Sequence, residues 1–206
     1  ELDERLLATP TLALERCHTL ITDMASYSLE ALRESLLCVG ENPEKYSCHI
    51  REDEAKTDHY EDIIGSYLVK LSARKIGESD SALAAEYLRL IGDFERIADH
   101  SVNVLEAAEE MRRKGIAFSP AAQEEYAVMA DAVREVTALA YDAYVSGDLS
   151  AAEKVEPLEQ VIDDLKEELR TRHIRRMQQG TCGIEAGFIW SDLLNDLERV
   201  SDHCSN

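Results

Sequence analysis

Apolar residues recur at helical spacing along almost the whole chain, in six segments separated by short polar turns. The turns are rich in glycine, proline and small polar residues and fall at 40–43, 77–80, 115–119, 146–148 and 180–183. Residues three and four apart share one face of a helix, and no segment shows sustained strand alternation. The pattern therefore predicts an all-α protein, with helices over about 10–36, 46–76, 81–114, 120–145, 149–179 and from 184 onward. Pro157 is expected to kink or restart the fifth helix.

The end of the chain repeats an earlier stretch, because residues 90–103 resemble residues 193–206. Seven pairs are identical: Leu90/Leu193, Asp93/Asp196, Glu95/Glu198, Arg96/Arg199, Asp99/Asp202, His100/His203 and Asn103/Asn206. Such self-similarity indicates an internal duplication. The sequence thus predicts two tandem antiparallel three-helix bundles, 10–115 and 116–206, laid end to end after a linker at 1–9.

The first copy of the repeated stretch carries a ladder of oxygen-bearing side chains. Glu95, Asp99 and Asn103 are spaced by four residues and so lie on one face of the predicted helix. The apolar stripe of the same helix, Tyr87, Ile91, Phe94, Ala98, Ser101 and Leu105, falls about 100 to 180° away. Because the stripe is expected to face the core, the ladder is expected to face outward. Like charges at this spacing repel one another, so we also expect the ladder to attract a cation.

The second helix of each half carries a matching acidic pair. Glu54-x-x-x-Asp58 lies in the first half and Glu159-x-x-x-Asp163 in the second. The offsets are 159 − 54 = 105 for these pairs and 198 − 95 = 103 for the closing ones, so the two copies align after a two-residue adjustment. Four Glu-x-x-x-Asp pairs in register are a much stronger signal than one pair in an acidic chain.

The charge balance narrows the possible partners. The chain has 22 basic and 42 acidic residues and a formal net charge of −20. This charge disfavours nucleic acid and anionic lipid and favours cations or a basic protein partner, although acidity also serves simple solubility. The five cysteines form no Cys-x-x-Cys pair, which indicates packing roles in a reducing compartment.

The stretch from Glu95 to His100, with Asn103, resembles the acidic motif of the PhoU phosphate-uptake regulators, and the likeness extends from about Thr9 to the end. The resemblance implies two similar three-helix bundles, a non-enzymatic regulatory role and, in some members, multinuclear iron or other metal clusters on the outer faces. By position, one site would comprise Glu54, Asp58, Glu95, Asp99 and Asn103, and the other Glu159, Asp163, Glu198, Asp202 and Asn206. The sixth helix ends just after its motif, which departs from the first half and leaves the second site less well supported.

The opening residues 2–10 further resemble the segment that joins the membrane part of bacterial sodium/phosphate cotransporter-like proteins to a cytoplasmic PhoU-like domain. This likeness, together with the absence of an initiator Met, leads us to expect a fragment of a longer protein. The expected partner is a membrane phosphate transporter, above all the chain's own transmembrane segment. A cytoplasmic, membrane-associated location and a homodimer are further expectations.

Alternative interpretations remain open from the residues alone. Clustered carboxylates without thiolates suit iron(III), manganese, magnesium or calcium, with zinc also feasible, but a solvated acidic face would hold only loose counterions. His100 and His203 are expected beside the sites rather than as ligands, and Arg96 and Arg199 as surface ion-pair partners. A structural adaptor without metal is one competing class. A di-iron oxidase is another, but it requires two Glu-x-x-His motifs and the chain has one, ending at His18.

Overall fold

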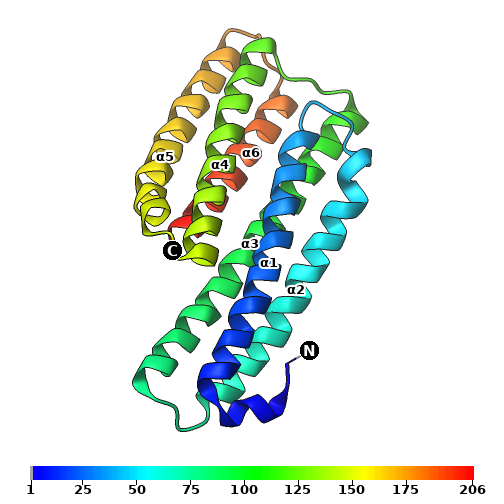
Figure 1. Ribbon diagram of the computed structural model, residues 1–206. Coiled ribbons are helices and arrows are strands. Elements are labelled where there is room, and N and C mark those ends of the chain that lie inside the picture. The colour runs from blue at the N-terminus through cyan, green and yellow to red at the C-terminus, as the bar shows by residue number, and fades with distance from the viewer. Residues whose placement is uncertain (1) are drawn as a thin grey trace.

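The computed structural model describes residues 2–206, and in this range the chain is helical without any strand. The predicted all-α fold is therefore confirmed (Figure 1). A short 3-10 helix, η1, precedes six α-helices: η1 Glu4–Ala8, α1 Pro10–Cys38, α2 Glu44–Ser72, α3 Glu78–Lys114, α4 Pro120–Ser146, α5 Leu149–Gln178 and α6 Ile184–Ser205. No helix in this range is both long and apolar enough to cross a membrane.

Helix ends fall close to the predicted positions because the turn residues satisfy the exposed backbone groups. The side chain of Ser119 accepts the amide of Ala122 at 3.2 Å, and that of Asp148 accepts the amide of Ala151 at 3.1 Å, so both begin their helices as N-caps. Gly115 ends α3 at φ 66°, a left-handed conformation that glycine adopts without strain. Pro157 does not restart α5, which runs unbroken through it.

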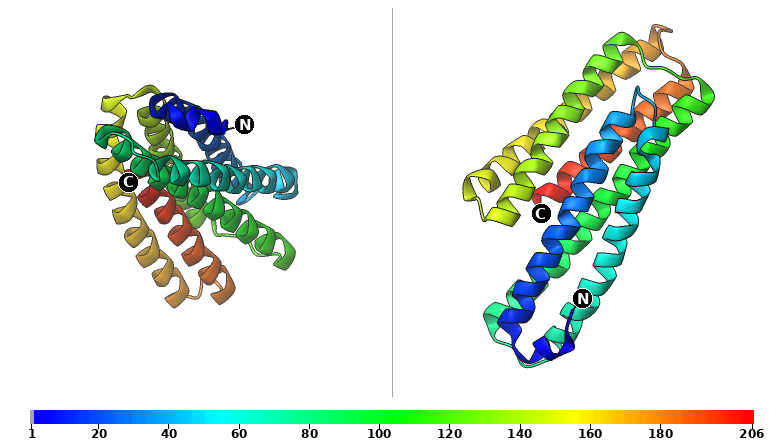
Figure 2. Two further views of the ribbon diagram at one scale, coloured as in Figure 1. Left: turned by 90° about the horizontal axis from the view of Figure 1, so that it is seen from below. Right: turned by 45° about the vertical axis from the view of Figure 1, so that its right-hand side comes forward.

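Each half of the chain folds into an antiparallel three-helix bundle, α1–α3 and α4–α6, as the duplication predicted. The end-to-end arrangement was wrong. The two bundles lie side by side and are displaced along their length, with α3 against α6 and α1 against α4 (Figures 1 and 2). A large hydrophobic core runs through both, since buried apolar residues of all six helices form a continuous cluster, and a smaller cluster lies between α1, α2 and α3.

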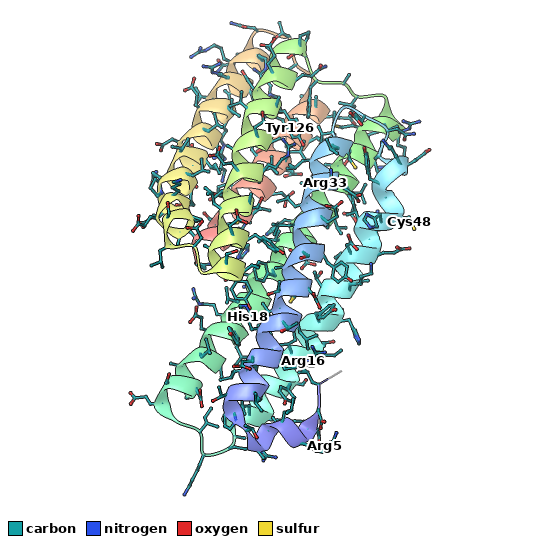
Figure 3. The ribbon with its side chains drawn as sticks, in the orientation of Figure 1. Arg5, Arg16, His18, Arg33, Cys48 and Tyr126 are labelled. Atoms are coloured by element: carbon teal, nitrogen blue, oxygen red, sulfur yellow. The ribbon has the colours of Figure 1, made fainter. Side chains whose placement is uncertain are left out.

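Aromatic residues explain why the bundles pack sideways. Phe94 of α3 lies edge-on to Tyr144 of α4, with ring centroids 5.9 Å apart. The hydroxyl of Tyr126, in the upper part of α4 (Figure 3), donates a 2.8 Å hydrogen bond to the carbonyl of Leu36 in α1. These side chains extend beyond their own three-helix bundle, and burying them requires the second bundle alongside.

The apolar stripe expected on the third helix is confirmed. Its members are all buried in the core: Tyr87, Ile91, Phe94, Ala98, Ser101 and Leu105. The acidic ladder of the same helix therefore turns toward the surface, with Glu95 half-buried and Asp99 exposed. The direction of the ladder followed correctly from helical spacing alone.

The amino-terminal residues are more ordered than a linker. Leu7 is buried with 4% of its surface exposed. The hydroxyl of Tyr67 donates a 3.0 Å hydrogen bond to the carbonyl of Asp3, and Lys70 pairs with Glu4 at 2.5 Å. Residues 3–8 thus form part of the first bundle, so the predicted linker at 1–9 is folded over residues 3–8, and its residue 1 lies outside the described part of the chain.

Candidate metal sites and the bundle interface

The first acidic ladder brings side chains of α2 and α3 together. Carboxylate oxygens of Asp58, Glu61 and Glu95 lie within 4.8 Å of one another. The carboxyl groups of Glu54 and Asp99 are in contact beside them, and Asp99 also contacts Glu95. The structure therefore places the four predicted acids of this site across the groove between two helices, and it adds Glu61.

Partial burial, together with repulsion from neighbouring carboxylates, raises the pKa values of Glu95, Glu54 and Glu61. Partial burial, followed by the contact with Asp99, raises the pKa of Glu95 to about 8. Burial and the charges of Asp99 and Asp58 raise the pKa of Glu54, and burial and Asp58 raise that of Glu61. Carboxyl groups that protonate this readily have too little positive charge around them.

The second ladder repeats this arrangement on α5 and α6. Oxygens of Glu159, Asp163 and Asp202 lie within 4.8 Å of one another. Burial and the contact with Asp202 raise the pKa of Glu159 to about 7, and burial raises the pKa of Asp202. The Oδ1 atom of Asp163 is buried and has no hydrogen-bond partner among residues 2–206. An orphaned carboxylate oxygen of this kind suits a cation.

The fourth predicted acid of the second ladder is already paired. The Nζ atom of Lys166 lies 3.1 Å from Oε2 of Glu198, and both side chains are about four-fifths buried, at 18% and 19% exposure. The offset of 105 between α2 and α5 places Lys166 at the position of Glu61, since 61 + 105 = 166. The first site thus has a carboxylate where the second has a cation, and the two ladders differ in charge.

The donor sets fit metal ions to different degrees. Five carboxylates converge on the first site and only oxygen is offered, which matches iron(III), manganese, magnesium or calcium. In the second site, three carboxylates remain after Lys166 has taken Glu198. The raised pKa values and the orphaned oxygen of Asp163 fit a bound cation, so a metal at these residues remains a prediction that the geometry favours.

The repeated stretches also contact each other directly, across the interface of α3 and α6. Nδ1 of His100 lies 3.0 Å from Oδ1 of Asp196, and Nδ1 of His203 lies 3.0 Å from Oδ1 of Asp93. The two imidazole rings stack, with centroids 5.8 Å apart. Each histidine of one bundle therefore holds the aspartate of the other, in a reciprocal pair that follows the duplication.

The asparagines of both ladders belong to this reciprocal pair. Nδ2 of Asn103 donates to Asp196 and Nδ2 of Asn206 donates to Asp93, both at 3.2 Å. Asn103 also lines a surface depression with Glu54 and Asp99, so it stands between the first ladder and the interface. The predicted metal role of the two asparagines stays a prediction, whereas their amide groups clearly tie the bundles together.

Sequence reasoning missed the role of Asp93 and Asp196, although both are identical in the two copies. Both lie off the ladder, and helical spacing alone assigns them no role. The residues that are identical in the two copies therefore fall into two groups. Some form the acidic ladders, and others form hydrogen bonds across the interface between the bundles. Helical position distinguishes the interface residues from the ladder residues, because Asp93 lies on the buried side of α3.

Two other expectations change. Arg96 and Arg199 were expected to form ion pairs. Among residues 2–206 the ion pairs of this region belong to His100, His203 and Lys166, and neither arginine takes part. Both arginines are exposed and line the depression that also contains Asn103. The imidazole of His18, the candidate oxidase ligand, packs against tyrosine rings at 4.9 and 6.3 Å rather than in a carboxylate cluster.

The fold and the site define a class of duplicated, all-α proteins in which paired acidic ladders flank an interface built from the same motif. The chain belongs to the PhoU domain family, whose pattern matches residues 21–108 and 127–206. The crystal structure of PhoU from Pseudomonas aeruginosa has a similar fold, with a TM-score of 0.76, 21% identity and coverage of 97% of this chain and 92% of that one.

Two curated relatives are similar in sequence. The "Phosphate-specific transport system accessory protein PhoU homolog 1" of Thermotoga maritima is 29% identical over 119 residues, which span 58% of this chain but only 50% of that protein. The PhoU homolog of Borreliella burgdorferi is 24% identical over 207 residues, spanning 94% of this chain and 88% of that protein. The two alignments thus cover half and most of their relatives, respectively.

Proposed function

We propose that this domain is a non-enzymatic regulator of phosphate transport that binds metal through its two acidic ladders. The observation that carries the proposal is the convergence of Asp58, Glu61 and Glu95 between α2 and α3, with Glu54 and Asp99 beside them. So many carboxylates in one groove repel one another by about 1 kcal/mol per pair at 4 Å in water, and more where partly desolvated. A multivalent cation turns this repulsion into attraction.

The regulated partner is a membrane phosphate transporter, with the chain's own transmembrane segment as the specific candidate. Both curated relatives are named as accessory proteins of a phosphate-specific transport system, which supports this class of partner. The likeness of residues 2–10 to the junction of cotransporter-like proteins supports a covalent link to the transporter. The domain would then act at the cytoplasmic face of the membrane, and two copies would pair if the transporter is a dimer.

The test combines a cellular and a chemical arm. Cells that lack this region are compared with cells carrying the intact protein, and with cells carrying Asp99→Asn together with Asp202→Asn, while uptake of radiolabelled phosphate is followed. We expect uptake to lose its dependence on external phosphate when the region is removed and to be altered in the double variant. Normal uptake and signalling after removal would overturn the regulatory role.

A metal-free adaptor is the second candidate, favoured by the internal cation that Lys166 supplies to the second ladder. It predicts that the double variant regulates uptake like the intact protein. Metal content of protein purified without chelator separates the two candidates, because only the metal-binding regulator carries iron, manganese or another cation at the ladders.

A further inference from the structure

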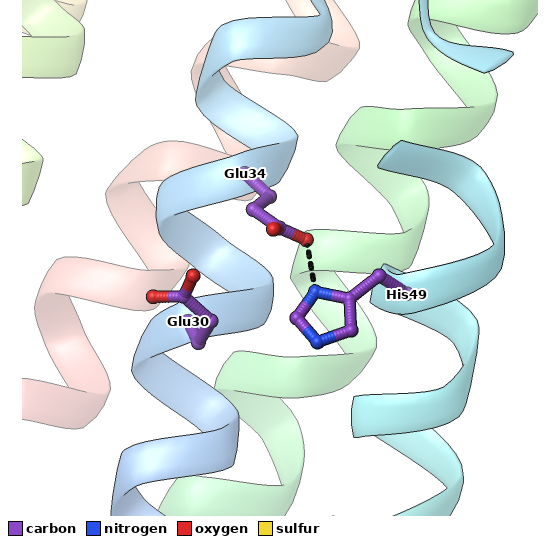
Figure 4. Close-up of side chains that lie close together, drawn as sticks. All are labelled: Glu30, Glu34 and His49. Atoms are coloured by element: carbon purple, nitrogen blue, oxygen red, sulfur yellow. Dashed lines mark hydrogen bonds and ion pairs between the residues drawn. The ribbon is translucent and has the colours of Figure 1, made fainter. Parts of the chain in front are cut away.

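A separate group of ligand-type side chains lies between α1 and α2. Glu30 and Glu34 are one turn apart on α1, and His49 and Asp53 are one turn apart on α2. Glu30, Glu34 and His49 each offer a ligand atom within 4.8 Å of the others. Figure 4 shows the Glu34 carboxylate directed at the imidazole of His49, with Glu30 one turn away on the same helix. No residue of either acidic ladder belongs to this group.

Glu34 fixes the orientation of the imidazole. Its Oε2 lies 2.7 Å from Nδ1 of His49, and the Glu34 side chain is only 10% exposed. With the proton on Nδ1 shared with this carboxylate, the lone pair of Nε2 is free to bind a metal. Carboxylates commonly hold metal-binding histidines in this way.

Asp53 supplies an oxygen that lacks a partner. Its side chain is 2% exposed, and its Oδ2 has no hydrogen-bond partner among residues 2–206. This atom lies 3.6 Å from Nε2 of His49, which is too long for a hydrogen bond. It is close to the separation of about 3.4 Å between two ligands of a tetrahedral zinc ion with bonds of about 2.1 Å. The other oxygen of Asp53 is held by Lys56 at 3.1 Å.

We propose that Nε2 of His49 and Oδ2 of Asp53 bind one divalent transition-metal ion such as zinc, and that Glu34 positions the imidazole. Glu30 lies near the imidazole and adds negative charge, but both of its oxygens also accept hydrogen bonds from Arg33, at 3.0 and 2.5 Å. One nitrogen with carboxylate oxygens is a donor set that zinc accepts readily. His49 is 49% exposed, so the ion reaches the site from solvent. This site is independent of the ladders, which offer oxygen alone.

A simple ion pair explains less of the geometry. A protonated His49 would donate to Glu34 through Nδ1 and would also form an ion pair with Asp53 through Nε2. At 3.6 Å this second contact is too long for a hydrogen bond, so the buried oxygen of Asp53 would still lack one, which is costly. A metal on Nε2 satisfies both carboxylates. The formal charges of Glu30, Glu34 and Asp53 exceed those of Arg33 and Lys56 by one, so a cation also improves the charge balance.

The site is confined to the first bundle. The offset of 105 places Lys154 and Leu158 of α5 at the positions of His49 and Asp53, since 49 + 105 = 154 and 53 + 105 = 158. Neither residue is a metal ligand of this kind. The group is therefore not a by-product of the duplication that created the ladders.

The test follows the imidazole itself. The full chain, labelled with ¹⁵N-histidine and freed of metal by chelator, is titrated with zinc alone while the ring nitrogens are observed by NMR. We expect Nε2 of His49 to shift at stoichiometric zinc while Nδ1 keeps its proton. His49→Asn retains a donor for Glu34 and should remove one zinc equivalent. Glu34→Gln should weaken binding about 10- to 100-fold, and Asp53→Asn at least as much.

His59→Gln is the matched control, because His59 is an exposed histidine of the same helix. It should bind as much zinc as the unaltered chain. The proposal is overturned if Nε2 of His49 does not respond to zinc, or if His49→Asn binds the same number of zinc ions as His59→Gln. Melting curves of each variant establish that the loss of an ion is not a loss of folding.

Discussion

At the scale of single residues, one exchange separates two sites that otherwise look alike. Glu61 adds a negative charge to the first ladder, whereas Lys166 at the matching position neutralises Glu198 in the second. This difference is visible in the sequence at the offset of 105, but positions 61 and 166 lie outside the Glu-x-x-x-Asp pattern. A repeated motif indicates the residues that the two sites share, but it gives no information on the position at which they differ.

Removing the internal cation should strengthen the second site. Lys166→Gln frees Glu198, and we expect cation binding at the second ladder to tighten by about tenfold, since one charge at close range is worth about 1 kcal/mol or more. Isothermal titration with manganese measures this change. Lys154→Gln, which alters an exposed lysine of the same helix, should leave the isotherm unchanged. An isotherm of Lys166→Gln equal to that control would contradict the asymmetry.

The reciprocal pair at the interface can be tested by deletion of one acceptor. Asp196→Ala removes the partner of both His100 and Asn103, and we expect a loss of about 1–3 kcal/mol in the free energy of unfolding. Urea denaturation provides the measurement. Asp192→Ala, an exposed aspartate of the same helix, should change the value by less than about 0.5 kcal/mol. Equal effects of the two variants would show that the pair contributes little.

At the scale of helices, the sequence predicted the six elements well because the turns carry strong signals. Pro10, Ser119 and Asp148 mark helix starts, and the glycines at 115 and 147 mark helix ends. The direction of each ladder also followed from spacing. Spacing did not predict which residues of the adjacent helix contact each ladder, because those contacts depend on how the two helices are rotated about their axes.

The ladders make the metal-free protein sensitive to pH. The folded-state pKa values of Glu95 and Glu159, about 8 and 7, exceed the ordinary value of 4.5. Between these values the folded state binds more protons than the unfolded state, so stability falls as pH rises. We expect the melting temperature in chelator to decrease from pH 5 to pH 8. Manganese should reverse the decrease, most strongly at pH 8, where protons compete least.

Melting temperatures measured every half pH unit, with chelator and with excess manganese, test this prediction. Glu95→Gln carries no titrating group at that position and should show a shallower decrease. If the melting temperature in chelator instead rises steadily to pH 8, the ladder carboxylates do not have raised pKa values in the folded protein, and the prediction is wrong.

At the scale of the whole molecule, the duplication predicted two bundles but not their placement. The end-to-end arrangement failed because helical spacing describes the burial within a bundle and gives no information on a second layer. Phe94, Tyr126 and Tyr144 look like ordinary core residues in the sequence, yet they also join the bundles. Asp93 and Asp196 also join the bundles, and the sequence does not reveal this, because their partners lie about a hundred residues away in the chain.

A shared core makes the two bundles one folding unit. The single tryptophan, Trp190, is 1% exposed and reports on the second bundle, whereas far-UV circular dichroism reports on all helices. We expect fluorescence and dichroism to give coincident thermal transitions, because separation of the bundles would expose the core between them. A fluorescence transition several degrees away from the dichroism transition would indicate that the bundles unfold independently.

The central claim is that the acidic ladders bind metal, and one measurement tests it most directly. The melting temperature of chelator-treated protein is recorded against manganese concentration for the unaltered chain, for Asp99→Asn with Asp202→Asn, and for the control Asp192→Asn. At 100 times the dissociation constant, binding to one site contributes about 2.7 kcal/mol, or an increase of about 5–10 °C for a chain of this size. We expect this increase in the unaltered chain and the control but a much smaller one in the double variant, whose metal-free form is slightly more stable. Equal increases in all three, or none in the unaltered chain, would contradict the claim.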